Sequence, residues 1–157
     1  MLAYIGLGSN LKDPKTQIKR ALASFDENCE TELIASSSLY ESRPLLNMPG
    51  PNYINAVCKI KTRLNAIDLL NLCQEIEEGQ QRVREVKWGS RTIDLDILLY
   101  GSQVILNKRL SIPHPEIINR AFVLVPLFEI EPSLRAPLLG PIKDLLDGVN
   151  KLDVKII

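Results

Sequence analysis

Apolar residues recur along the N-terminal part of the chain with the two spacings that strands and helices require. Residues 2–8 form a short, mostly apolar run that predicts a buried strand. Asp13 and Pro14 then supply a helix cap and a proline at the first helical position, so we expect an amphipathic helix over 14–27. Its apolar positions recur at intervals of three and four residues: Ile18, Ala21, Leu22 and Phe25. Residues 32–41 are expected to form a second strand.

Strict alternation of side-chain type predicts a strand with two different faces over residues 53–62. The face expected to point into the core carries Ile54, Ala56, Cys58 and Ile60. The opposite face carries Tyr53, Asn55 and Val57. The preceding residues 42–52 hold three prolines, one glycine and two asparagines, which is the composition of a loop. A loop of this length in a compact domain usually has a functional role.

A second amphipathic helix is predicted over 66–78, with Asn65 as its cap and Gly79 as its stop. Its apolar stripe consists of Leu69, Leu72, Cys73 and Ile76. Residues 80–90 are polar and basic and follow neither a helical nor a strand period, so we expect an irregular segment there.

The C-terminal half of the chain has a looser pattern. We expect a strand over 92–100, turned back into a short partner strand at 103–106. A helix over 121–131, interrupted by Pro126, and a short final helix over 142–147 follow. Strand–helix–strand segments joined by hairpin-type links predict an α+β sandwich, with helices on a mixed or antiparallel sheet.

Composition places the chain among ordinary globular proteins. Its 157 residues suit one compact domain, and its 19 basic and 19 acidic residues give zero net charge, so we expect neither nucleic acid nor a membrane as partner. The longest apolar run is shorter than the ~18 residues that span a bilayer, and we expect a cytoplasmic protein. The three cysteines, Cys29, Cys58 and Cys73, show no metal-site spacing and are expected to be reduced, buried thiols.

The most informative strand carries two carboxylates. On an extended chain Asp94 and Asp96 point to the same face, with Cα atoms about 6.6 Å apart. Two neighbouring carboxylates on a core strand repel each other and need cations, and divalent metals with oxygen ligands, Mg²⁺ above all, suit them. An Asp-x-Asp pair on a solvated sheet face that binds lysine or arginine is the alternative, and the motif alone favours it.

The segment just before these carboxylates shifts the balance. Residues 82–91 contain four basic side chains, Arg82, Arg84, Lys87 and Arg91, in a chain without net charge. Guanidinium groups match phosphate oxygens in pairs, so a basic segment beside a carboxylate–metal pair suits a polyphosphate. A solvated surface loop would explain the charges, but not the single tryptophan, Trp88, which is costly to expose.

The run from Lys87 to Leu98, Lys-Trp-Gly-Ser-Arg-Thr-Ile-Asp-Leu-Asp-Ile-Leu, resembles the signature of the 6-hydroxymethyl-7,8-dihydropterin pyrophosphokinase family. The resemblance continues along nearly the whole chain. Further segments that match the family are Ala3–Asn10, Tyr53–Ala56, Gln74–Arg84, Pro113–His114, Asn119–Phe122 and Pro126–Ile130.

The resemblance implies an enzyme of folate biosynthesis that transfers pyrophosphate from ATP to the hydroxymethyl group of 6-hydroxymethyl-7,8-dihydropterin and leaves AMP. It implies two Mg²⁺ ions held by Asp94 and Asp96. It also implies a monomeric, three-layer αβα sandwich with a mostly antiparallel, ferredoxin-like sheet, and we expect residues 1–157 to form this single domain.

Site residues follow from the resemblance by position. The pterin would lie between Tyr53 and Phe122, with its ring edge bonded by Asn55. Backbone groups of Ser42 and Leu45 would assist, and Trp88 would close over the site. Arg82 and Arg91 would engage the phosphates and act in catalysis with Asp94 and Asp96. The residues implied for the ATP site are Gln74, Glu77, Arg84, Lys87, Trp88, Arg91, Ile97, Arg109, Ser111, His114 and Arg120. Without the resemblance, Phe122 would be interpreted as core and His114 as a structural histidine.

The chain departs from the family pattern at a few positions. Lys87 stands where relatives often have arginine, Pro115 where some have tyrosine, and Leu46 where glycine is common. Ser42 replaces a threonine.

Two other classes of function remain open at this stage. A Mg²⁺-dependent phosphohydrolase or nucleotidyltransferase would share the carboxylate pair but would need no pterin. A non-enzymatic, ferredoxin-like binding module would use its sheet to hold a partner. Dinucleotide binding at Gly6-Leu-Gly8 is excluded because Leu11 occupies the third glycine position.

Overall fold

The computed structural model describes residues 1–44, 50–80 and 92–157. Its helices are α1 (Pro14–Glu27), α2 (Ala66–Gln80), α3 (Ala121–Ile130) and α4 (Ile142–Leu146), with 3₁₀ turns η2 (Ile117–Asn119) and η3 (Lys151–Asp153). Its strands are β1 (Leu2–Ser9), β2 (Thr31–Ser36), β3 (Tyr40–Ser42), β4 (Tyr53–Thr62), β5 (Asp94–Tyr100), β6 (Ile105–Leu106), β7 (Ser111–Ile112), β8 (Arg135–Ala136), β9 (Gly140–Pro141) and β10 (Val154–Ile156).

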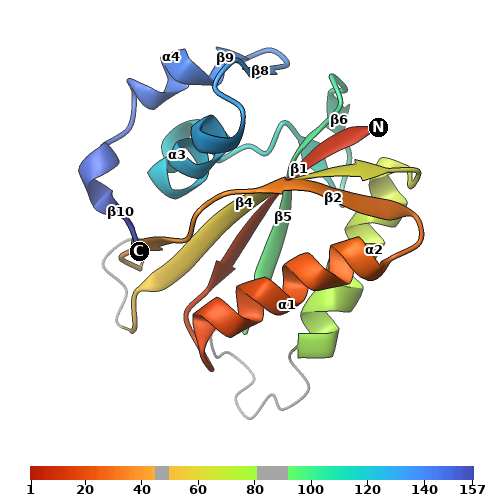
Figure 1. The fold of residues 1–157 in the computed structure, drawn as a ribbon. Coiled ribbons are helices and arrows are strands. Elements are labelled where there is room, and N and C mark those ends of the chain that lie inside the picture. Colours follow the sequence, from red (N-terminus) through yellow and green to blue (C-terminus); the bar gives the residue numbers. More distant parts are fainter. Residues whose placement is uncertain (45–49, 81–91) are drawn as a thin grey trace.

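The central sheet has six strands in the order β10-β3-β4-β1-β5, and β2 pairs with β4 beside β3. Every pairing in this sheet is antiparallel. Helices α1 and α2 lie on one face, whereas α3 and α4 lie on the other (Figure 1). The predicted three-layer αβα sandwich with an antiparallel sheet is therefore confirmed.

Two apolar cores separate these layers. The first lies between the sheet and helices α1 and α2, and the alternation predicted for β4 is confirmed because its four core positions all belong to it. The second lies between the sheet and helices α3 and α4 and includes Tyr4, Val57 and Leu124. Each fully buried aliphatic side chain contributes roughly 1.5–3 kcal/mol. These cores hold β1 and β4 rigidly at the centre of the sheet.

Helices α1 and α2 begin where the sequence predicts, but the cap of α1 and the end of α2 differ from the prediction. Helix α1 covers the predicted 14–27, but Asp13 adopts a left-handed conformation and makes no side-chain bond to the backbone of the helix. Its carboxylate accepts the hydroxyl of Thr16 at 2.7 Å instead. Asn65 caps α2 as predicted, because its Oδ1 accepts the main-chain N–H of Asp68 at 2.8 Å. Gly79 does not end α2, since the helix continues to Gln80.

The predicted strand over 32–41 is wrong as one element. It divides into β2 and β3 at Ser37, which interrupts the ladder with its own side chain. The Ser37 hydroxyl accepts the main-chain N–H of Val57 at 3.0 Å, while the Ser37 N–H donates to the Val57 carbonyl at 2.9 Å. The side chain thus takes the place of a backbone acceptor, and the strand bends.

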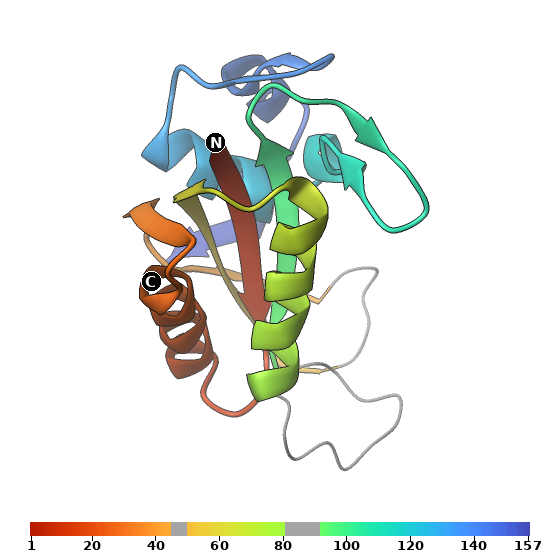
Figure 2. The same ribbon diagram turned by 90° about the vertical axis from the view of Figure 1, so that its right-hand side faces the viewer.

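Two pairings were not predicted. Strand β6 pairs with β7 and not with β5, so the expected hairpin from β5 is wrong. The β6–β7 hairpin projects from the same flank of the molecule as β5 and α2 (Figure 2). Near the C-terminus, β10 pairs with β3.

Strand β5 contains an irregularity that shifts its faces. Ile97 pairs with Ile5, but the next pair is Leu99 with Tyr4, so Leu98 is the extra residue. The prediction that Leu99 shares a face with Ile97 is therefore wrong: Ile97 lies in the first core and Leu99 in the second. The irregularity comes after Asp96, so the two carboxylates keep their common face.

All three cysteines are free. Cys58 and Cys73 are buried as expected, whereas Cys29 is exposed, so that part of the prediction is wrong. Among the residues that the structure describes, no helix combines the length and the apolar character needed to cross a membrane.

Candidate active site

A cavity of about 450 Å³ opens between the sheet and the first turn of α3. Its floor comes from the middle of the sheet, and α3 covers it. The lining residues are Gly6, Leu7, Gly8, Asn10, Ser42, Arg43, Pro44, Tyr53, Asn55, Ala56, Glu77, Asp94, Asp96, Leu98, Arg120, Phe122 and Val123. Eight of the predicted site residues therefore meet in one space: Ser42, Tyr53, Asn55, Glu77, Asp94, Asp96, Arg120 and Phe122.

The floor of the cavity exists because β1 has glycines where a side chain would fill it. Gly8 pairs with Asn55 on one side and with Asp94 on the other. A Cβ atom at Gly8 would lie 3.4 Å from Oδ1 of Asn55. Gly6 pairs with Asp96 in the same way. The carboxylates of β5 thus face the amide of β4 across open space.

One end of the cavity is built to hold a polar ring edge. Asn55 is only 3% exposed, and its Nδ2 donates to the Ser42 hydroxyl at 2.7 Å. This bond fixes the orientation of the amide, so its donor and acceptor have set places. Tyr53 lies two residues away on the same face of β4. Burial raises the pKa of Tyr53, and the charge of Asp94 raises it further, so the phenol stays protonated.

The start of α3 contributes an aromatic ring, Phe122, and the residue just before the helix contributes a cation, Arg120. The Arg120 guanidinium lies 5.6 Å from the centre of the Phe122 ring, within range of a cation–π interaction. Its Nη1 lies 4.0 Å from Oδ2 of Asp96. Arg120 therefore connects the ring-binding end of the cavity with its carboxylate end.

Glu77 reaches the start of β5 from α2. Its side chain is 9% exposed, and Oε2 accepts the main-chain N–H of Leu95 at 3.0 Å. This contact holds the strand between the two aspartates against the end of α2. The bond positions both carboxylates, which lie on either side of Leu95.

His114 lies beside the outer edge of β5, where its main-chain N–H donates to the Leu98 carbonyl at 3.0 Å. Burial lowers the pKa of His114; Asp96 opposes this shift and Arg120 adds to it. Its Nδ1 accepts the Glu116 main-chain N–H at 3.1 Å, so the neutral ring carries its proton on Nε2. The neutral ring can donate one hydrogen bond.

Three more residues of the predicted nucleotide site lie on this flank. Arg109 donates from Nη2 to Gln74 at 3.3 Å and to Asn71 at 2.6 Å. Ser111 belongs to β7, which packs beside β5. None of these three lines the cavity, so they extend the predicted site along the open edge of the sheet.

Ile97 differs from the other predicted nucleotide residues. Its side chain is 3% exposed and lies in the core under α1 and α2. It faces away from the two aspartates, so only its main chain is available to a nucleotide. Six predicted site residues lie outside the described part of the chain: Leu45, Arg82, Arg84, Lys87, Trp88 and Arg91. Leu46 lies outside it as well.

Several lining residues were not predicted. Asn10 is 6% exposed, and its Oδ1 has no hydrogen-bond partner among the described residues. Gly6 and Gly8 follow the same alternation on β1 as the aspartates on β5, and Asn10 comes directly after the end of β1. The alternation on β1 could have indicated these residues, but only if β1 had been known to lie beside β5. The sequence alone does not reveal that strand order.

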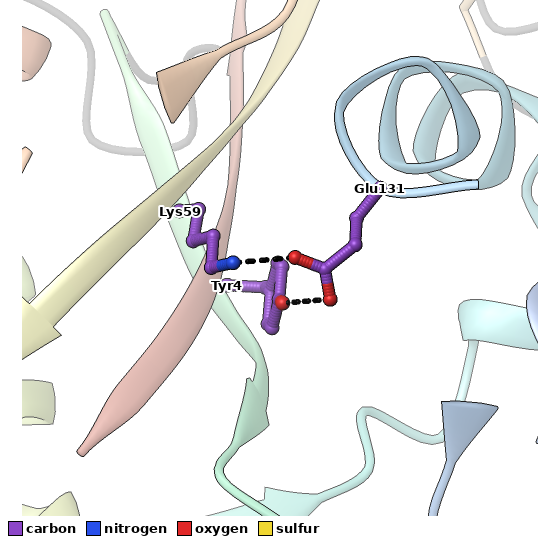
Figure 3. Close-up of polar contacts among 3 residues, drawn as sticks. All are labelled: Tyr4, Lys59 and Glu131. Carbon is purple, nitrogen blue, oxygen red and sulfur yellow. Dashed lines mark hydrogen bonds and ion pairs between the residues drawn. The ribbon is translucent and has the colours of Figure 1, made fainter. Parts of the chain in front are cut away.

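Two glutamates near the C-terminal end of α3 fix the helix to the sheet. Glu131 accepts the Tyr4 hydroxyl and the Lys59 ammonium, each at 2.5 Å (Figure 3). Glu129 accepts the Tyr40 hydroxyl and, at 2.9 Å, the main-chain N–H of Ser38. Burial raises the pKa of Tyr4 and of Tyr40, and the adjacent carboxylates add to the shift. Both phenols therefore remain hydrogen-bond donors at neutral pH.

Comparison with known proteins gives one consistent result. A family model described as 7,8-dihydro-6-hydroxymethylpterin-pyrophosphokinase matches residues 4–132. The 2-amino-4-hydroxy-6-hydroxymethyldihydropteridine pyrophosphokinase of Haemophilus influenzae is 51% identical over 135 residues, which cover 86% of this chain and 84% of the relative. The protein of the same name from Pseudomonas aeruginosa is 48% identical over 154 residues, which cover 95% of each chain.

Solved structures show the same fold. The crystal structure of wild-type Plasmodium falciparum HPPK-DHPS with pterin and p-hydroxybenzoate superposes with a TM-score of 0.74 at 17% identity. The match covers 93% of this chain but 42% of that chain, so this chain spans less than half of the Plasmodium protein. The likeness supports the ferredoxin-like class of the sheet.

Proposed function

Because this chain belongs to the 7,8-dihydro-6-hydroxymethylpterin-pyrophosphokinase family, we propose that its cavity binds the pterin and ATP together and catalyses pyrophosphate transfer between them. The enzyme is a 2-amino-4-hydroxy-6-hydroxymethyldihydropteridine pyrophosphokinase of folate biosynthesis. It transfers pyrophosphate from ATP to the hydroxymethyl group of 6-hydroxymethyl-7,8-dihydropterin, and AMP is the second product. The observation that carries the assignment of the site is that the ring-binding end and the carboxylate pair share one cavity.

The pterin binds at the end formed by β3, β4 and α3. Tyr53 and Phe122 stack on the two faces of the ring, and aromatic stacking suits a flat heterocycle. The buried Asn55 amide, oriented by Ser42, both donates and accepts at the ring edge. Backbone groups of Ser42 and Leu45 complete the recognition in this proposal.

Asp94 and Asp96 are the proposed holders of two Mg²⁺ ions. The donor set fits Mg²⁺, which accepts one or two carboxylates and completes its shell with water and phosphate oxygens. Asp96 is 47% exposed, so its oxygens are open to ligands from solvent. When bound, Mg²⁺ supplies charge neutralisation for the triphosphate and acidity for the attacking alcohol.

ATP lies from the aspartates outwards along the edge of β5. In this proposal, phosphate oxygens are bound by Arg120, which lies beside Asp96, and by the Nε2 proton of His114. This side of the site is extended by five further residues: Gln74, Glu77, Arg109, Ser111 and, through its main chain, Ile97. The proposal completes this side of the site with five residues outside the described ranges: Arg82, Arg84, Lys87, Trp88 and Arg91.

The reaction is an in-line displacement at the β-phosphorus of ATP. The pterin hydroxymethyl oxygen forms the new bond and releases its proton to solvent, while the bond from the β-phosphorus to the α-phosphate oxygen breaks and AMP leaves. Asn55 and the two aromatic rings hold the pterin so that its hydroxymethyl group points to the aspartates. Arg82 and Arg91 stabilise the charge that develops on the leaving AMP.

Three further properties belong to the same proposal. Residues 1–157 act as a single domain, the enzyme is a monomer, and it works in the cytoplasm. The resemblance to the family supports all three. Sedimentation equilibrium of the purified chain and fractionation of its host cells test the second and third.

Release of AMP from ATP, measured with and without 6-hydroxymethyl-7,8-dihydropterin at varied Mg²⁺, tests the function. AMP formation that requires both pterin and Mg²⁺ supports it. ATP turnover without pterin would favour a phosphohydrolase or nucleotidyltransferase. A chain that binds no Mg-ATP and forms no AMP would favour a binding module.

A further inference from the structure

We propose that Tyr40 and Glu129 are positioning residues that set the gap between Phe122 and Asn55, and so determine how tightly the pterin is held. This inference rests on the proposed function of the cavity. Neither residue lines the cavity. They act through the elements that form its two walls.

Tyr40 belongs to the floor of the ring-binding end. It pairs with Asn55 across β3 and β4, and Asn55 lines the cavity, as do both members of the next pair on this face, Ser42 and Tyr53. Directly opposite residues on antiparallel strands place their side chains on the same face. Tyr40 is 7% exposed, and the Asn55 amide lies 3.5 Å from its carbonyl oxygen. A shift of Tyr40 therefore displaces the Asn55 amide.

Glu129 belongs to the roof. It is seven residues beyond Phe122 on α3, close to two full helical turns, so both side chains lie on nearly the same helix face. The distance between them along the axis is about 10.5 Å. Pro126 removes one helical hydrogen bond, but buried Leu124 and Leu127 pack α3 on both sides of it, so the helix moves as one body.

The contact between these two walls is a charge-assisted hydrogen bond. The Tyr40 hydroxyl donates to Oε1 of Glu129, and the Ser38 hydroxyl and N–H donate to Oε2 at 3.0 and 2.9 Å. Glu129 thus binds the start of β3 to α3. The space for the pterin lies further along both elements, between Asn55 and Phe122.

The chain offers a matched control in a second Tyr–Glu pair. Tyr4 donates to Glu131 at the end of the same helix. It lies on β1 and is opposite Lys59, not a residue of the ring-binding end. Tyr4→Phe and Tyr40→Phe each remove one hydroxyl that bonds to a glutamate near the end of α3. Only Tyr40 is paired with a residue of the ring-binding end, Asn55.

Binding of 6-hydroxymethyl-7,8-dihydropterin is measured by calorimetry with Mg²⁺ and a non-hydrolysable ATP analogue present. We expect Tyr40→Phe and Glu129→Gln to raise the pterin dissociation constant about three- to tenfold, since tenfold is close to the lower end of what one charge-assisted hydrogen bond contributes. Nucleotide affinity should stay within about twofold. Tyr4→Phe should lower the melting temperature about as much as Tyr40→Phe does, while its pterin affinity stays unchanged. Equal pterin affinity in all variants, or equal loss from both tyrosine variants, would overturn the proposal.

A second readout needs no ligand. Protein labelled with 4-fluorophenylalanine reports the surroundings of Phe122, assigned by Phe122→Leu. The Phe122 fluorine signal should move in Tyr40→Phe and Glu129→Gln but not in Tyr4→Phe; an unmoved signal in the first two would refute the positioning role. A wild-type chain that binds no pterin would instead refute the proposed function, and the fluorine signal would still decide the positioning.

Discussion

Asn55 and Asp94 are opposite partners of the same residue: both pair with Gly8, one from β4 and the other from β5. Neighbouring strands lie about 4.8 Å apart, so the Asn55 amide, proposed to bind the pterin, and the Asp94 carboxylate, proposed to bind metal, are separated by about two strand spacings. That span is open only because Gly8 has no side chain.

Replacing Gly8 by valine should separate folding from binding. Valine suits a strand better than glycine, by up to about 1 kcal/mol, so the melting temperature should be equal or higher. Its branches would occupy the space beside Asn55 and Tyr53, and pterin affinity should fall by about 30-fold or more. Thermal unfolding and calorimetry on one preparation check both. Retained pterin affinity in a well-folded Gly8→Val protein would mean that the ring binds elsewhere.

The aspartates should be needed for turnover but not for the fold. Asp94→Asn and Asp96→Asn should each lower kcat by about 10²- to 10³-fold, because each removes an anionic ligand from the proposed metal pair. Removal of metal with EDTA should abolish AMP formation, and added Mg²⁺ should restore it. Asp153→Asn, an exposed change outside the cavity, is the control and should leave kcat unaltered. Activity near the parent level in either β5 variant would contradict the metal assignment.

Ser42 should matter because it orients Asn55. Ser42→Ala removes the 2.7 Å acceptor of the buried Asn55 amide and leaves it only the 3.5 Å contact with the Tyr40 carbonyl, at a cost of about 1–3 kcal/mol. We expect the KM for the pterin to rise about tenfold with kcat and the KM for ATP little changed. Ser42→Thr keeps the hydroxyl and should restore the parent KM. A Ser42→Ala enzyme with unchanged pterin KM would show that Asn55 holds its orientation without the Ser42 hydroxyl.

The Glu131 carboxylate should stabilise the fold in a pH-dependent way. Burial raises the pKa of Glu131, but bonds from Lys59 and Tyr4 outweigh this and hold the pKa below its ordinary value of 4.5. A depressed pKa in the folded state stabilises the protein above pH 4.5, and this stability is lost as the pH falls through the folded value. Because the pair is partly exposed, the contribution is about 1 kcal/mol or less.

The measurement compares the parent with Glu131→Gln. At pH 7 the parent should melt at the higher temperature, and the difference should shrink as the pH falls below 4.5. A difference that stayed constant down to pH 3 would show that the charge of Glu131 contributes nothing.

Thiol reactivity should distinguish the three cysteines. Cys29 is exposed, whereas burial raises the pKa of Cys58 to about 12 and also raises that of Cys73. In the native protein a maleimide should therefore label one thiol, and in denaturant all three; mass spectrometry counts the adducts. Rapid native labelling of Cys58 would show that the core under α2 opens.

Local patterns predicted those parts of the chain where propensity and burial agree. The 3.6-residue period gave α1 with its bounds, and the two-residue period gave both faces of β4. They failed where a long-range contact decides. The break at Ser37 depends on a bond to Val57, and the face of Leu99 depends on an extra residue in the pairing with β1. Neither contact partner is near in sequence.

The candidate site shows the same division. The positions of Asp94, Asp96, Tyr53 and Asn55 on their strands follow from alternation alone. Bringing them into one cavity required the strand order, because β1 lies between β4 and β5. For this reason Gly8, the residue that joins the two halves, was not recognised as part of the site.

Because of the extra residue at Leu98, the two ends of β5 differ in how they tolerate a shift of register. A slip of one residue in a regular strand would turn every following side chain to the opposite face. Here the strand already absorbs such a slip just beyond Asp96. An insertion or deletion between this point and Tyr100 can therefore be accommodated here. An insertion or deletion before Asp94 would instead turn both carboxylates towards the apolar core beneath α2.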